Sequence, residues 1–154
     1  MRSALNIAAA VAIAASGFSL PAAAAERGKD LAFNGDSLLA EQARGKSYWV
    51  LQSQCAGLFG AASFYMGKQG QAEDAEAAKV QALGFYRDAV DRLVRDRGLE
   101  TAQATAAVSH LVSTSRTDEL KLISRDGLGA TTPWNVRRSI CLDIADAYKT
   151  ARYQ

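Results

Sequence analysis

The stretch KSYWVLQSQCAGLFGAASFYMGK, residues 46–68, has no charged side chain between its two lysines. Aromatic side chains near both ends of this uncharged run give it the outline of a membrane span. The amides of Gln52 and Gln54 argue against a span, because side-chain amides are costly at membrane depth. We therefore predict a helix that is buried on most of its sides within a protein domain.

Small residues recur along this helix at intervals of four. Ser53, Gly57 and Ala61 form one row, and Ala56 and Gly60 form a second. Such rows let the backbone of a neighbouring helix approach closely, so tight helix packing is one explanation of the glycines. The other explanation is a groove for a flat apolar ligand. Its candidate lining residues are Gly57, Phe59, Gly60, Ala61, Phe64 and Tyr65.

The first residues, 1–25, predict a signal peptide. Arg2 supplies a positive start, and residues 4–20 are uncharged and mostly apolar. Pro21 is followed by alanines, which form the small-residue site that signal peptidase cleaves, here before Glu26. An uncleaved N-terminal anchor is the alternative, because the apolar run approaches the length of a bilayer span. Cleavage implies a periplasmic or secreted protein.

The remaining chain holds two cysteines, Cys55 and Cys141. An even number of cysteines in an oxidising compartment is typical of a disulfide. The pair lacks the C-x-x-C spacing of a redox catalyst, so we predict a structural disulfide that joins two helices.

Residues 26–35 are expected to form a flexible N-terminal segment, and residues 36–154 a single helical domain. Residues 26–154 contain one proline, many Ala, Gln, Leu, Arg and Asp residues, and no long alternation of β-branched side chains. This composition predicts an all-α fold. Four main helices joined by short turns predict a small up-and-down bundle, in which the first and last helices are neighbours.

Capping and turn residues place the first two helices. Asp36 or Ser37 is the expected N-cap of the first helix, which ends at the turn over 67–70. The second helix spans 72–97, and Gly98 stands where a helix-ending glycine belongs. Its apolar stripe is expected to consist of Val80, Leu83, Tyr86, Val90, Leu93 and Val94.

The second half of the domain is divided by hydroxyl residues and turns. A third helix is expected over 100–112, and the hydroxyl run 113–115 is expected to end it before a short helix that runs to Arg125. Thr132 and Pro133 begin the last helix, as a capping hydroxyl followed by proline at the first helical position. Its apolar face is expected to consist of Trp134, Ile140, Cys141, Ile144 and Tyr148, with Val136 flanking it.

Charge gives no support for a nucleic-acid partner. The chain has 18 basic and 16 acidic residues, and they are dispersed along the sequence. Binding to phosphates needs a concentrated basic patch, which this pattern does not contain.

No catalytic or metal-binding motif is found. His110 is the only histidine, and no Ser-His-acid arrangement or Glu-x-x-His motif surrounds it. A haem ligated by His110 and Met66 between helices is an alternative, but the C-x-x-C-H motif of covalent attachment is absent. We therefore expect no enzyme activity, no metal and no cofactor.

These observations predict an exported helical domain that acts by binding another protein or by self-association. The alternative is a carrier of a small apolar ligand, held between the first and last helices beside the small-residue rows.

Overall fold

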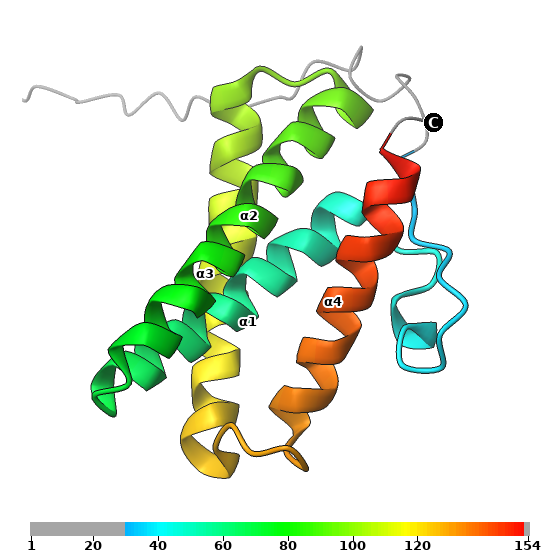
Figure 1. The fold of residues 1–154 in the computed structure, drawn as a ribbon. Coiled ribbons are helices and arrows are strands. Elements are labelled where there is room, and N and C mark those ends of the chain that lie inside the picture. The colour runs from blue at the N-terminus through cyan, green and yellow to red at the C-terminus, as the bar shows by residue number, and fades with distance from the viewer. Residues whose placement is uncertain (1–29, 153–154) are drawn as a thin grey trace, which may run out of the picture.

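The computed structural model describes residues 30–152, so the predicted signal peptide and residues 26–29 lie outside it. The described chain forms four long helices after one short 3-10 turn, η2 (Figure 1). Their bounds are Glu41–Ala43 for η2, Tyr48–Lys68 for α1, Ala72–Arg97 for α2, Thr101–Asp126 for α3 and Pro133–Ala151 for α4. The all-α prediction with four main helices is confirmed.

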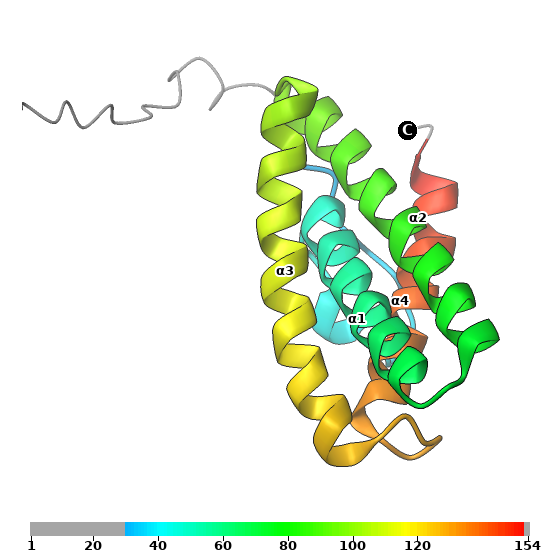
Figure 2. The ribbon, with the colours of Figure 1, turned by 90° about the vertical axis from the view of Figure 1, so that its left-hand side faces the viewer.

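Helix α1 lies at the centre and packs against α2, α3 and α4. Figure 2 shows α1 between α3 and α2, with α4 behind it. Even the polar side chains of Gln52 and Ser53 are fully buried, as expected for a helix enclosed on most sides. Among residues 30–152, no helix is long and apolar enough to cross a membrane.

Helix α2 has the predicted bounds, but it buries a different face. Gly98 ends it in a left-handed conformation with φ of 60°, as the sequence indicates. The predicted stripe is wrong at Val80 and Leu83, whose exposed fractions are 59% and 45%. Ala78 instead belongs to the core cluster that contains α1, and Ala82 packs against this cluster. Phe85 stacks on Phe59 with 5.6 Å between ring centroids. The buried apolar residues of α2 are Ala78, Phe85, Ala89, Val90 and Leu93.

Helix α3 is continuous, so the predicted break at 113–115 is wrong. Two of the three hydroxyl groups form hydrogen bonds to backbone carbonyl oxygens without interrupting the helix. Thr114 donates to the carbonyl oxygen of His110 at 3.1 Å, and Ser115 donates across to the carbonyl oxygen of Gln54 in α1 at 3.0 Å. Packing against α1 therefore outweighs the weak helix propensity of these residues.

The predicted start of the first helix is also wrong. Ser37 does act as a cap, because its Oγ accepts hydrogen bonds from the backbone N–H groups of Leu39 at 3.1 Å and Ala40 at 3.3 Å. It caps only a single turn, which η2 follows. Helix α1 begins later, at Tyr48.

Residues 30–35, from the segment predicted to be flexible, are held against the helices. Phe33 is fully buried, and its ring meets that of Tyr48 edge-on at 5.9 Å. The backbone N–H of Leu31 donates to Asp96 Oδ2 at 3.0 Å, and the same carboxylate pairs with Arg92. The sequence prediction had assigned Phe33 no place in the core.

Asp30 ties this segment to α1 and α2. Its carboxylate accepts hydrogen bonds from Arg97 at 2.8 and 3.0 Å and from the Ser47 hydroxyl at 2.8 Å. The indole N–H of Trp49 donates a further hydrogen bond at 3.3 Å. The hydrogen bonding by Arg97 is the main reason that the pKa of Asp30 falls from its ordinary 3.8 to about 2.

Helix α4 begins at Pro133, as predicted from the Thr132-Pro133 pair. The Thr132 hydroxyl does not cap the helix but donates to the carbonyl oxygen of Gly129 at 2.8 Å. The predicted apolar face is confirmed at its three most buried positions, Cys141, Ile144 and Tyr148.

Candidate functional site

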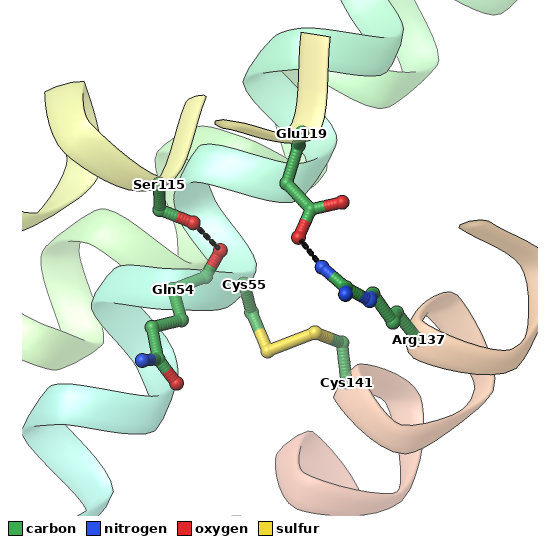
Figure 3. Close-up of a disulfide and its surroundings, with 6 residues drawn as sticks. All are labelled: Gln54, Cys55, Ser115, Glu119, Arg137 and Cys141. Carbon is green, nitrogen blue, oxygen red and sulfur yellow. Dashed lines mark hydrogen bonds and ion pairs between the residues drawn. A yellow bond between two sulfur atoms is a disulfide. The ribbon is translucent and has the colours of Figure 1, made fainter. Parts of the chain in front are cut away.

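A disulfide joins the central helix to the last helix. Cys55 of α1 and Cys141 of α4 have an S–S distance of 2.06 Å and a Cα–Cα distance of 5.6 Å, which confirms the predicted inter-helix bond. Both cysteines are buried. Figure 3 shows that Ser115 and Glu119 of α3 lie close to this bond.

A cleft of about 560 Å³ opens beside the disulfide, between α3 and α4, with α1 as its floor. We call it the α1/α3/α4 cleft. Its apolar surface comes from the two cysteines and from Leu51, Leu58, Leu111, Ile140 and Ile144. Its exposed polar rim consists of Gln42, Lys46, Gln54, His110, Thr114 and Asp118. The η2 turn therefore contributes to the rim together with α1 and α3.

An ion pair forms part of the cleft wall. Glu119 of α3 points toward Arg137 of α4, and Arg137 Nη1 donates to Glu119 Oε1 (Figure 3). The Glu119 side chain is 10% exposed, whereas that of Arg137 is 49% exposed. The second carboxylate oxygen of Glu119, Oε2, is buried and has no hydrogen-bond partner within the described part of the chain.

The charges that line the cleft are balanced. Lys46 and Arg137 contribute two positive charges, and Asp118 and Glu119 contribute two negative charges. Asp118 is exposed and pairs with Lys121 at 3.0 Å, outside the cleft. Selectivity for a charged ligand would therefore have to come from the position of one group rather than from the net charge.

The candidates for the predicted groove lie elsewhere, and none of the six lines the cleft. Gly57 packs against α3, since a Cβ atom there would lie 2.5 Å from the Cβ atom of Ser115. A Cβ atom at Gly60 would lie 3.7 Å from Cδ of Arg116. Gly57 therefore serves close helix packing, whereas a Cβ atom at Gly60 would make only an ordinary van der Waals contact.

The larger candidates are also engaged in other contacts. Phe59 stacks on Phe85, and Ala61 is fully buried. Phe64 is half-exposed, with the Lys68 ammonium and the Arg116 guanidinium over its ring at 5.6 and 5.5 Å from the centroid. Tyr65 is partly buried against the main core.

One signal in the sequence could have located the cleft. Residues of α3 that line it recur in pairs at intervals of four, which places them on one side of the helix. Five of the six side chains in this set are polar, so it does not stand out as a hydrophobic stripe. The set comprises His110, Leu111, Thr114, Ser115, Asp118 and Glu119.

Known chemistry offers no further guide to the site. Within residues 30–152, no group of three or more His, Cys, Asp or Glu side chains is placed to hold a metal ion. Comparisons of the chain with protein-family models, with curated proteins and with solved structures find no match. The geometry of the cleft is therefore the basis for the functional proposal.

Proposed function

We propose that this chain is an exported helical domain that binds a small amphipathic molecule in the α1/α3/α4 cleft without transforming it. The observation that supports this is the cleft itself. Its volume of about 560 Å³ falls within the range of roughly 300–1,000 Å³ that is typical of small-molecule sites. The apolar floor and the polar rim together suit a molecule that has both an apolar part and a polar part.

Export is the second part of the proposal. A disulfide such as Cys55–Cys141 persists in oxidising compartments, and the predicted signal peptide over 1–25 would deliver the chain there. We therefore propose a periplasmic or secreted carrier. This retains the ligand-carrier alternative from the sequence. The ligand site moves, however, from the small-residue rows to the face of α1 that carries Cys55.

A neutral fluorescent probe tests the cleft. N-phenyl-1-naphthylamine brightens when it enters an apolar site, and it is titrated into the oxidised protein. Thr114→Trp adds a large side chain at an exposed rim position and should fill the opening. Ser113→Trp is the matched control, because Ser113 is an exposed neighbour on the same helix that does not line the cleft.

We expect the wild type and Ser113→Trp to bind the probe equally, and Thr114→Trp to bind it at least about tenfold more weakly. That loss corresponds to about 1.4 kcal/mol of binding free energy. Equal binding by all three proteins, or no saturable binding by the wild type, would contradict the proposal.

Self-association is a second candidate, and the exposed faces of Val80 and Leu83 on α2 support it. These side chains lie three positions apart, so a second copy could cover both. Sedimentation velocity of the wild type should then show a dimer that Leu83→Lys disrupts. Leu38→Lys, at an exposed leucine outside the helices, is the control and should leave the dimer intact. A monomer at all concentrations would exclude this candidate.

A further inference from the structure

We infer that the ligand of the α1/α3/α4 cleft carries an ammonium group on an apolar skeleton, and that Glu119 binds this group. The inference rests on the proposed function and adds the chemical class of the ligand. It begins from Glu119 Oε2, a buried carboxylate oxygen without a hydrogen-bond donor in the described chain.

Glu119 is one of the residues that line the cleft, although Oε2 itself has almost no exposed surface. The side chain extends from α3 toward Arg137 and the disulfide (Figure 3). Nine-tenths of the side chain is buried. A buried carboxylate oxygen without a donor is unfavourable, because the group has lost water and gained no replacement. A ligand that donates a hydrogen bond there would remove this deficit.

The partner of Glu119 leaves room for such a donor. Arg137 occupies only Oε1, and half of its side chain is in solvent. Because half of the Arg137 side chain is already in solvent, this side chain can shift outward without leaving a cavity in the core. An ammonium group that enters beside it can donate to Oε2 while its apolar chain lies on Leu58, Ile140 and the disulfide.

The negative charge of Glu119 should distinguish among the polar groups that a ligand could carry. An ammonium group adds opposite charge to the hydrogen bond, and such charge-assisted bonds are roughly twice as strong as neutral ones. A hydroxyl group can donate but carries no charge, and a carboxylate would meet Glu119 with like charge. The expected order of affinity is therefore ammonium first, hydroxyl second and carboxylate last.

Three probes with the same ten-carbon chain test this order. Decylamine and decanoate, each below its critical micelle concentration, and 1-decanol, below its solubility limit, displace N-phenyl-1-naphthylamine from the protein at pH 7.5. In the wild type, decylamine should displace the probe at a concentration at least about tenfold lower than decanoate does. Equal or stronger displacement by decanoate would overturn the inference.

Two variants, each of which removes one negative charge, test whether the preference for decylamine depends on Glu119. Glu119→Gln should abolish the preference for decylamine and favour decanoate, because Arg137 is then left without its partner. Asp146→Asn makes the same change in net charge at an exposed position of α4 that does not line the cleft, and it should retain the preference. A preference that Asp146→Asn lowers as much as Glu119→Gln would mean that general charge, not Glu119, selects the ligand.

A third variant covers the case in which Glu119→Gln does not fold, as judged by circular dichroism. Arg137→Gln changes a half-exposed side chain and frees both carboxylate oxygens, so the preference for decylamine should increase. A decrease would contradict the inference. Failure of the probe to bind at all would refute the proposed function together with this inference, whereas equal displacement by the three ten-carbon compounds would refute this inference alone.

Discussion

The two sides of α1 are joined to their neighbours by different means. On the side of α3, Gly57 lets the helices approach so closely that an added Cβ atom would lie 2.8 Å from the backbone nitrogen of Arg116. On the side of α4, the Cys55–Cys141 disulfide holds the helix beside an open cleft. Close packing leaves no space for a ligand, whereas a covalent bond can hold two helices together while space remains between them.

Removing the disulfide should have the largest effect. The two cysteines are 86 positions apart, so Cys55→Ala with Cys141→Ala should lower the free energy of unfolding by about 4.5 kcal/mol in the chain-entropy model. Urea denaturation of the oxidised wild type and of the double variant measures this loss. Reduced wild type is the control and should resemble the variant. A loss below about 1 kcal/mol would mean that packing alone holds α4 in place.

The close contact between α1 and α3 should be sensitive to the addition of a single methyl group. Gly57→Ala places a Cβ atom 2.5 Å from Cβ of Ser115, and overpacking of this kind costs roughly 1–3 kcal/mol, more than the helix gains from alanine. We expect a net loss of about 2 kcal/mol in urea denaturation. An unchanged or increased stability would show that α3 moves away without cost, and that the contrast between the two sides is weaker than the contacts indicate.

The polar attachment of Asp30 to the start of α1 and the end of α2 can be distinguished from the disulfide and from the Gly57 contact by its pH dependence. The depressed pKa of Asp30 means that its ionised form is stabilised by folding, an effect present above about pH 4 and lost as pH falls to about 2. Asp30→Asn should therefore cost about 1–2 kcal/mol at pH 7, and the difference from wild type should nearly vanish at pH 2. Neither the disulfide nor Gly57 titrates in this range. A difference that does not change with pH would refute the role assigned to the charge.

The smallest effect is expected at a glycine without close neighbours. A Cβ atom at Gly84 of α2 would meet nothing within 4 Å, so Gly84→Ala should raise stability by about 0.5–1 kcal/mol through helix propensity. The variant serves as the control for Gly57→Ala, since both change a helical glycine to alanine. A loss of stability here would mean that glycine is needed for a reason other than helix contact.

The sequence was sufficient for the features that depend on local chemistry. The buried character of α1 follows from its lack of charge, and the start of α4 follows from Pro133 at the first helical position. The disulfide follows from the number of cysteines and the predicted export. Each of these inferences needs only neighbouring residues or a count.

The features that were missed depend on contacts between distant segments. Ser115 reads as a helix-weakening residue, but its bond to the carbonyl oxygen of Gln54 fixes it within α3. Val80 and Leu83 read as core residues, but they are exposed. Ala78 instead belongs to the core cluster that contains α1, and Ala82 packs against this cluster. The cleft depends on how α3 and α4 diverge over α1, and no local pattern in the sequence encodes that angle.

The most direct test of ligand binding in the cleft is a methyl ¹H–¹³C NMR titration of the oxidised protein with N-phenyl-1-naphthylamine. Shifts should concentrate on the methyl groups of Leu58, Ile140 and Ile144, which line the cleft. The methyl groups of Val90 and Leu93, in the separate core cluster between α2 and α3, should not change. Shifts at Val80 and Leu83 without changes at Ile140 and Ile144 would contradict a binding site in the cleft.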